Sequence, residues 1–272
     1  MHTYYRCPVC EDRLSLSGKS YICENRHTFD ISKEGYVNFA IGKSDSGDSR
    51  DMCLSRRAFL AKDYYLGFSQ LICDTVAEFC TPSALLDAGC GEGYYLRKLR
   101  ERFPQAELFG IDLAKEAIRL ASKSEKQVQG LRNLYSVCGI FSLPFFDNSF
   151  DAVISVFAPI GDAENLRVLK NGGFLFAAGP GKTHLSGLKS AIYDAPYENP
   201  EKHKEYEGFR YLGKRSKCYS VTVEKEDIMD LFTMTPYFWK TSKKDCEKLL
   251  ALPYLETELS FEISVYKAEK GE

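Results

Sequence analysis

The chain has 272 residues, 44% of them hydrophobic, and a formal net charge of −2. A chain of this length can form one large domain and one small one without disulfide bonds. The nearly neutral charge excludes the strong overall attraction to nucleic acid of a basic protein, so local patches would have to bind any polyanion. The sequence has neither an apolar run long enough to cross a membrane nor a signal peptide, which predicts a cytoplasmic protein without a membrane partner.

The first forty residues contain two closely spaced pairs of metal-binding side chains. Two residues separate Cys7 from Cys10, twelve more lead to Cys23, and three separate Cys23 from His27. Pairs with this spacing can converge on one tetrahedral Zn²⁺. Protein side chains would fill all four positions, so the ion would be structural and would stabilise a segment too short to fold alone. We therefore predict a zinc-binding module over residues 1–42. Its basic and aromatic residues are of the kind that bind RNA, although acidic residues are nearly as frequent there.

A segment rich in Gly, Ser and Asp follows and predicts a linker over residues 43–54. Residues 55–272 are predicted to form a second domain. Apolar residues at helical spacing indicate one helix over residues 55–80. Strand-like and helix-like segments then alternate from "ALLDAG", which begins at residue 84, to "GGFLFAAG", which ends at residue 179. This alternation predicts an α/β fold with a parallel sheet, helices on both faces, and ligands bound at the carboxyl ends of the strands.

The turn "DAGCGEG" comes at the end of the first of these strands. Gly89, Gly91 and Gly93 have no Cβ, which permits unusual backbone angles and lets a ligand approach the main chain. The helix that follows directs its free N–H groups at the same space. Nineteen residues past Gly93, Asp112 ends the second strand, where a carboxylate suits the hydroxyls of a ribose. A dinucleotide-binding turn would have the spacing G-x-G-x-x-G, whereas this one has G-x-G-x-G preceded by Asp87.

The turn resembles the first motif of the class I S-adenosylmethionine-dependent methyltransferases, in which the first acid and the turn hold the aminoacyl part of the cofactor. The resemblance implies a Rossmann-like methyltransferase domain over residues 55–272 and S-adenosylmethionine as cofactor, and it leaves the methyl acceptor open. After the third strand, "GIFSLPF" resembles the segment that contacts adenine in this class. Ile140 stands there where many members carry an acid, so the adenine contact departs from the common pattern.

Together with the paired cysteines, the motifs "RRAFL", "GCGEGYY", "KTHL" and "MTPYFW" resemble the ribosomal RNA large subunit methyltransferase A family. Enzymes of that family methylate N1 of a guanine in hairpin 35 of 23S rRNA. The resemblance implies that the zinc ligands are Cys7, Cys10, Cys23 and His27. It implies, together with the glycine-rich turn, that the cofactor contacts are Tyr65, Asp87, Gly89, Gly91, Glu92, Gly93, Asp112 and His184. The expected partners are the rRNA hairpin and, in a homodimer, a second copy of the chain.

The implied reaction is an in-line displacement in which guanine N1 attacks the methyl group, after losing its proton to a carboxylate, to His184 or to water. A paired base must swing out of the hairpin, and Tyr94, Tyr95 and Phe157 are candidates to hold it as well as to pack. Trp239 is expected in the core or in a subunit contact. Two alternatives stay open: a methyltransferase that acts on a small quinone or phenol, and a zinc-ribbon RNA-binding protein with an inactive methyltransferase fold.

Overall fold

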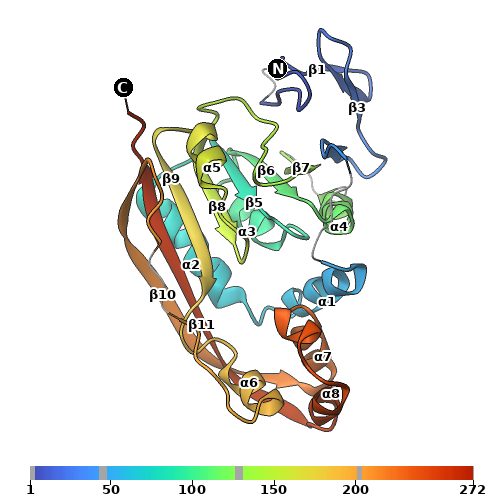
Figure 1. Ribbon diagram of the computed structural model, residues 1–272, viewed down its shortest axis with the longest axis vertical. Coiled ribbons are helices and arrows are strands. Elements are labelled where there is room, and N and C mark those ends of the chain that lie inside the picture. Colours follow the sequence, from blue (N-terminus) through green and yellow to red (C-terminus); the bar gives the residue numbers. More distant parts are fainter. Residues whose placement is uncertain (1–3, 43–47, 126–130, 201–203, 272) are drawn as a thin grey trace.

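The computed structural model describes residues 4–42, 48–125, 131–200 and 204–271 (Figure 1). It consists of a three-stranded sheet near the N-terminus, an eight-stranded sheet, and a group of helices at the end of two long strands. The elements in chain order are β1 (Ser15–Ser17), β2 (Ser20–Ile22), β3 (Thr28–Asp30), β4 (Val37–Asn38), α1 (Arg50–Leu60), α2 (Leu66–Phe79), β5 (Ala84–Ala88), α3 (Tyr94–Arg102), β6 (Glu107–Asp112), α4 (Lys115–Glu125), β7 (Leu134–Val137), β8 (Phe150–Val156), α5 (Asp162–Val168), β9 (Leu169–Pro180), α6 (Ser186–Ile192), β10 (Phe209–Glu224), α7 (Lys225–Thr233), the 3₁₀ helix η1 (Pro236–Trp239), α8 (Lys243–Leu250) and β11 (Tyr254–Ala268).

The large sheet has the strand order β10-β11-β9-β8-β5-β6-β7-β4. The strands from β9 to β4 run parallel, whereas β11 is antiparallel to β9, and β10 is antiparallel to β11. The predicted α/β fold with central parallel strands is confirmed. The sequence prediction lacks β10 and β11, which make the sheet mixed. In β11, buried residues alternate with more exposed ones, as is usual in an antiparallel strand with one solvated face.

The two faces of the sheet are covered differently. On one face, residues of α2, α3 and α4 share a hydrophobic core with Leu85 and Leu108. On the other face, α5 and the N-terminal module share a core with Leu86 and Phe109. The predicted helices are therefore present on both faces, but on the second face the module shares the cover with α5. Residues 138–149, between β7 and β8, form no helix, because Gly and Pro in this segment oppose one, and the module covers the sheet there instead.

Aromatic side chains attach the module to the sheet. The ring of Tyr4 lies 4.8 Å from that of Phe109, and the ring of Tyr5 lies 5.2 Å from that of Phe145. Backbone bonds join the same parts, because the Arg6 N–H donates to the carbonyl of Pro144 at 3.0 Å. In addition, β4 pairs with β7 and forms the last strand of the large sheet. The module is thus part of the hydrophobic core of the larger domain.

The predicted linker over residues 43–54 can be followed only from residue 48 onward. Its residues 43–47 lie outside the described residues, as do residues 1–3 of the module. Residues 50–54 belong to α1, because the Ser49 hydroxyl accepts a hydrogen bond from the Met52 N–H at 3.3 Å and caps the helix. The division into residues 1–42, 43–54 and 55–272 stays a prediction.

The helix predicted over residues 55–80 is two helices, α1 and α2. Between them Asp63 adopts a left-handed conformation with a φ of 59°, which ends the first helix. The turn brings Tyr65 to the start of α2, with its side chain buried. Helical periodicity continues across the break, so the spacing of apolar residues alone does not reveal it.

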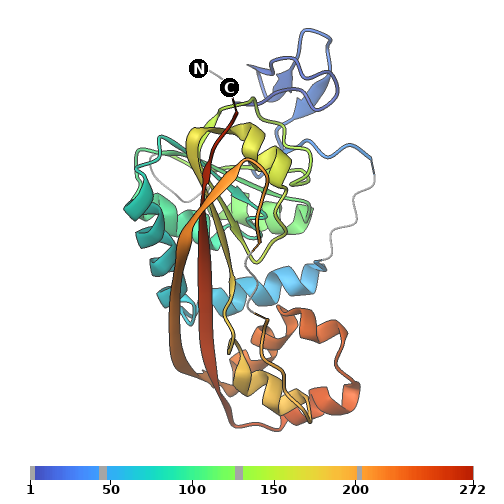
Figure 2. The same ribbon diagram turned by 60° about the vertical axis from the view of Figure 1, so that its left-hand side comes forward.

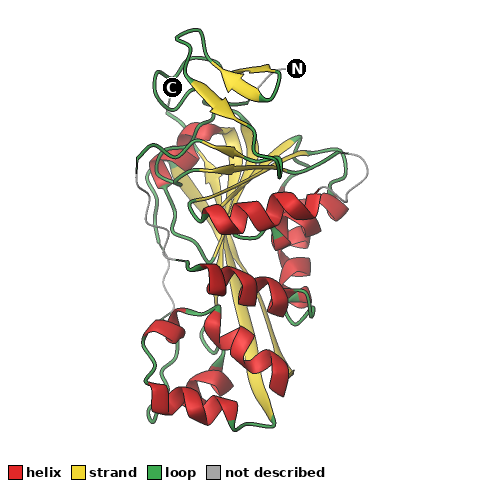
Figure 3. Ribbon diagram, turned by 90° about the vertical axis from the view of Figure 1, so that its right-hand side faces the viewer, coloured by secondary structure: helices red, strands yellow, loops and turns green. Residues whose placement is uncertain are grey.

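The helices α6, α7, η1 and α8 gather at the end of the molecule that is opposite to the zinc-binding module (Figures 2 and 3). We call this group the helical lobe. It is carried by the far ends of β10 and β11, and its α7 packs against α1. Among the helices that the structure describes, none combines the length and the apolar character that crossing a membrane requires.

Candidate functional site

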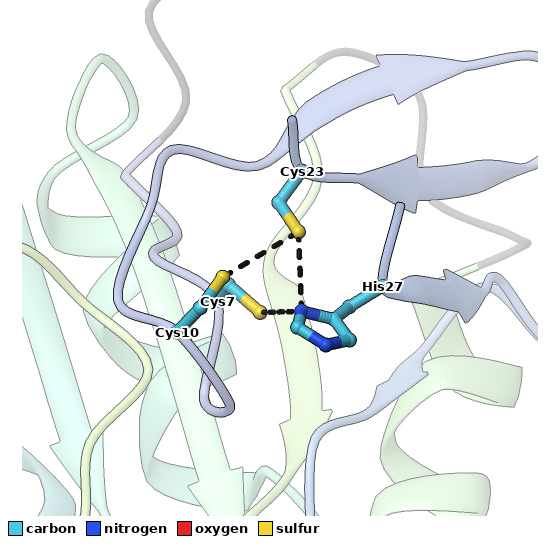
Figure 4. Close-up of side chains that lie close together, drawn as sticks. All are labelled: Cys7, Cys10, Cys23 and His27. Carbon is cyan, nitrogen blue, oxygen red and sulfur yellow. Dashed lines mark hydrogen bonds between the residues drawn. The ribbon is translucent and has the colours of Figure 1, made fainter. Parts of the chain in front are cut away.

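The side chains of Cys7, Cys10, Cys23 and His27 converge at one point of the module (Figure 4). Their four ligand atoms lie within 4.8 Å of one another. His27 Nδ1 is 3.5 Å from Cys7 Sγ and 3.4 Å from Cys23 Sγ, and the Sγ atoms of Cys10 and Cys23 are 3.6 Å apart. The first two cysteines come from the loop before β1, and the other pair flanks the turn between β2 and β3.

These separations fit a zinc ion. With Zn–S bonds of about 2.3 Å and Zn–N bonds of about 2.0 Å, tetrahedral geometry separates ligand atoms by roughly 3.5–3.8 Å. The Val9 N–H points at Cys7 Sγ at 3.5 Å, an arrangement that favours a thiolate. Because four protein side chains complete the coordination, such an ion would support folding and would offer no position to a substrate.

A cavity of about 660 Å³ lies between the carboxyl ends of the parallel strands and the helical lobe. The segments that follow β5 and β8 and the last residues of β6 and β9 line it from the sheet. Residues 234–237 line it from the lobe, and Met52 and Arg56 line it from α1. Its volume suits a ligand of cofactor size. The predicted cofactor residues that line it are Tyr65, Gly89, Gly91, Glu92, Asp112 and His184. Asp87 and Gly93 belong to the same turn but do not line the cavity.

The glycine-rich turn requires its glycines. Gly89, Gly91 and Gly93 have φ angles of 88°, 54° and 81°, which residues with a side chain rarely adopt. A Cβ on Gly89 would lie 2.5 Å from the Cβ of Ala158. The turn therefore passes directly beside the end of β8, and its main chain forms part of the cavity wall.

Two carboxylates stand at the base of this turn. Asp112 accepts hydrogen bonds from the backbone N–H groups of Gly91 at 2.9 Å and Ala114 at 2.8 Å. Asp87 is fully buried, and neither of its carboxylate oxygens has a hydrogen-bond partner among the described residues. Burial, and then the nearby charge of Asp112, raise the pKa of Asp87 well above its usual value. A buried carboxylate of this kind is stabilised by a ligand that brings a positive charge or hydrogen-bond donors.

Tyr65 and His184 meet in the lining of the cavity. Tyr65 Oη lies 3.3 Å from His184 Nε2, and His184 Nδ1 is buried without a partner among the described residues. Burial lowers the pKa of His184 to about 3, so the imidazole is neutral at neutral pH. His184 therefore enters the cavity lining as a neutral hydrogen-bonding group.

Glu92 is predicted as a cofactor residue and lines the cavity, but its carboxylate accepts a hydrogen bond from Arg97 at 3.0 Å.

Other residues of the cavity lining are not among the predicted cofactor residues. Arg56 and Asp48 form an ion pair of 2.5 Å within the cavity wall, and no pattern in the sequence indicates it. Arg56 does lie in the motif "RRAFL", but the motif does not indicate which of the two arginines faces a cavity. Residues 234–237 belong to the motif "MTPYFW", but the motif does not indicate that they line a cavity, and the tertiary fold brings them there.

The structure separates the aromatic candidates for holding a base. Tyr94 and Tyr95 also line the cavity, but both side chains are buried. Phe157 is 47% exposed, lines the cavity and has a positive φ of 54°. Such a strained conformation at a cavity indicates a functional constraint. For Trp239 the sequence predicts a place in the core or in a subunit contact. The core is wrong, because Trp239 is 62% exposed and its Nε1–H points at Met52 Sδ at 3.3 Å, and the subunit contact stays a prediction.

The residues around the cavity fit S-adenosylmethionine. Ribose hydroxyls suit Asp112, and the glycine-rich turn permits close approach of the ligand. Asp87 does not line the cavity, but its unpartnered carboxyl lies at the end of the strand that leads into this turn, where a nearby ammonium group would balance its charge. This cavity lies at the carboxyl ends of parallel strands, where ligands bind in open α/β sheets.

The fold and the site define a class I S-adenosylmethionine-dependent methyltransferase that carries a zinc ribbon. The chain is 33% identical, over 88% of its own length and 88% of the relative's, to YxjB of Bacillus subtilis strain 168, provisionally named a 23S rRNA (guanine-N(1)-)-methyltransferase. It belongs to that family of enzymes, the ribosomal RNA large subunit methyltransferase A family.

Other comparisons agree with this membership. Residues 5–40 match the zinc-ribbon family described as "RlmA, N-terminal", and residues 85–173 match the family described as "Methyltransferase domain". The 23S rRNA (guanine(748)-N(1))-methyltransferase of Streptomyces fradiae is 31% identical over 70% of this chain and 68% of its own. A malonyl-[acyl-carrier protein] O-methyltransferase of Gallionella capsiferriformans strain ES-2 is 34% identical over a smaller share, 41% of this chain and 42% of its own.

Proposed function

We propose that the protein transfers a methyl group from S-adenosylmethionine to N1 of a guanine in hairpin 35 of 23S rRNA in the cytoplasm. The observation that carries the proposal is the similarity to relatives named for 23S rRNA guanine N1, which extends over 88% of the chain for one of them. The match to a malonyl-carrier methyltransferase extends over 41%. A 23S rRNA substrate therefore has more support than a small-molecule substrate.

We propose Cys7, Cys10, Cys23 and His27 as the zinc ligands, which their convergence supports. In the cavity, S-adenosylmethionine supplies a methyl group activated on a sulfonium. Asp87 and the glycine-rich turn would hold its aminoacyl end, and Asp112 its ribose. Tyr65 and Glu92 would form the adjoining walls, and His184 would offer its neutral ring to the ligand.

The acceptor base would enter beside Phe157. This side chain is exposed and lines the cavity, and an aromatic face can hold an extruded base by stacking. Guanine N1 must lose a proton before its lone pair can attack. His184, with a pKa lowered to about 3 by burial, is a weak base and is poorly suited to accept that proton. A carboxylate of the cavity or a water molecule is better suited.

The test is methyl transfer to defined RNA. The full chain, loaded with zinc, is incubated with labelled S-adenosylmethionine and with unmodified 23S rRNA or a fragment that carries hairpin 35. We expect label in both RNAs, and mass spectrometry of the digested product should place it on guanine N1 within the hairpin. Label in 23S rRNA outside hairpin 35 would contradict the proposed position and leave the family's reaction intact.

The two alternatives give different results in the same experiment. No label in RNA at any salt concentration, with cofactor binding intact by calorimetry, would point to a small acceptor such as a quinone or phenol. Absence of cofactor binding would point to an RNA-binding protein with an inactive methyltransferase fold. The proposed homodimer is tested separately, by the molar mass of the protein in solution with and without RNA.

A further inference from the structure

The cofactor brings both signs of charge into the cavity. Its aminoacyl end carries an ammonium group and a carboxylate, and the buried Asp87 can balance only the ammonium. The described lining residues include three acids, Asp48, Glu92 and Asp112. A carboxylate placed among them without a cation would be repelled. The site therefore needs a positive group near the glycine-rich turn.

Arg56 is the one side chain with a positive charge among the described residues that line the cavity. The other basic side chain of the lining, His184, is neutral because burial lowers its pKa to about 3. Arg56 belongs to α1, outside the residues 5–40 and 85–173 that the family models match. Its side chain is 27% exposed, so most of its charge is withdrawn from solvent.

The guanidinium of Arg56 lies beside the turn that would hold the aminoacyl group. Its Nη1 is 3.7 Å from the position that a Cβ on Gly91 would occupy. The same Nη1 donates to Asp48 Oδ2 at 2.5 Å, which holds the group in the cavity wall. A guanidinium has five N–H donors, and the hydrogen bonds of the described residues use one of them at Arg56. Donors remain for a second carboxylate.

We propose that Arg56 binds the carboxylate of the aminoacyl group of S-adenosylmethionine, and that Asp48 positions its guanidinium for this contact. Arginine suits this role because its planar fork of N–H groups matches a carboxylate. The ion pair then holds the aminoacyl end with a charged group, whereas Tyr65 and His184 supply neutral groups to the same cavity. This proposal rests on the cofactor and is independent of the RNA acceptor.

The test compares two ligands that differ only in the carboxylate. Calorimetry with the full zinc-loaded chain measures the affinity for S-adenosylhomocysteine and for its decarboxylated analogue. Arg56→Gln should weaken binding of S-adenosylhomocysteine about tenfold to a hundredfold, the usual effect of losing a hydrogen bond between charged groups. Binding of the decarboxylated analogue should not change. Equal losses for both ligands, or no loss for either, would overturn the proposal.

Arg57 supplies the matched control. It follows Arg56 on α1, but its guanidinium donates to the carbonyl of Leu120 at 3.4 Å and to Ser124 Oγ at 3.1 Å, away from the cavity lining. Arg57→Gln should bind both ligands as the unchanged protein does. If Arg56→Gln does not fold, Arg56→Lys keeps the charge and serves the same comparison. It should lose affinity for the carboxylate ligand alone, and an equal loss for both ligands would again refute the role.

Discussion

His184 lies almost fully buried beside Tyr65, and its burial has an effect on stability at acid pH. Its pKa is lowered to about 3 in the folded chain, against about 6.5 in an unfolded one. Between these values the unfolded chain binds a proton that the folded chain does not. The contribution to stability is therefore complete above pH 6.5 and is lost as the pH falls toward 3.

We expect this group to lower the free energy of unfolding by about 2 kcal/mol between pH 7 and pH 5. His184→Gln keeps a polar side chain but cannot titrate, so its free energy of unfolding should fall less over the same interval. Urea unfolding of both proteins at the two pH values measures the difference. Identical pH dependence in the two proteins would show that His184 does not titrate on unfolding in this way.

Phe157 is the aromatic residue best placed to hold the acceptor base. Phe157→Ala should raise the KM for RNA by about tenfold, since stacking on one base contributes about 1–3 kcal/mol. Affinity for S-adenosylhomocysteine should remain. Phe141 gives a control, because it is 69% exposed and does not line the cavity. If Phe141→Ala impairs RNA methylation as strongly, the effect of Phe157 is not a property of the cavity.

At the scale of single residues, the sequence predicts those functional residues that lie close to one another along the chain. The two cysteine-containing pairs and the glycine-rich turn are each encoded within a few residues, and the structure brings them together as expected. Arg56 and the residues 234–237 are not recoverable in that way. They reach the cavity through the packing of α1 against α7, which no local pattern specifies.

The strands of the zinc-binding module are expected to depend on its four metal-binding side chains. Its strands β1, β2 and β3 are only three residues long and are mostly exposed, so they bury little surface of their own. Cys23→Ser should lower the zinc content and the unfolding temperature of the protein. Cofactor affinity should change little, because the cavity lies at the carboxyl ends of the strands. The ring of Tyr4 in the module contacts Phe150, which is at the opposite, amino end of β8.

Cys246→Ser is the matched control for this experiment. Cys246 is partly buried in α8 and lies outside the cluster of the four ligands. Metal analysis, thermal unfolding and calorimetry are measured for both variants. An unchanged zinc content in Cys23→Ser would contradict the ligand set, whereas loss of zinc in Cys246→Ser would indicate a second site.

The alternating strands and helices between residues 84 and 179 are predictable because each has a clear period and each is bounded by turn residues. The long strands β10 and β11 are not predicted, because their pairing is set by contacts between distant segments. The packing of the zinc-binding module on the face of the sheet that carries Leu86 and Phe109 is also not predictable. Nothing local indicates that Tyr4 and Tyr5 pack where a helix is expected.

The whole molecule has its zinc ribbon and its helical lobe at opposite ends (Figure 2). An RNA that touches the ribbon while one of its bases enters the cavity must therefore extend along the side of the protein. Residues 234–237 of the helical lobe form part of the cavity wall, so the cofactor would bridge the lobe and the large sheet. Binding should then stabilise the lobe more than the ribbon.

Hydrogen exchange measures this effect. Saturation with S-adenosylhomocysteine should slow amide exchange in α7 and η1, which adjoin the cavity. At a hundred times the dissociation constant the stabilisation is limited to about 2.7 kcal/mol, or roughly a hundredfold in rate. Exchange in β2 and β3 should not change. Equal slowing in the ribbon and the lobe would show that the cofactor stabilises the molecule as one unit.

The placement of β4 beside β7 has a consequence for solubility. β4 occupies the edge of the large sheet, and the module covers Phe109 and Phe150 on its face. Without the module, an open strand edge and an apolar aromatic surface would be exposed together, a combination that promotes aggregation. A chain shortened to residues 55–272 is therefore expected to precipitate. For the same reason, chelation of zinc should first produce turbidity.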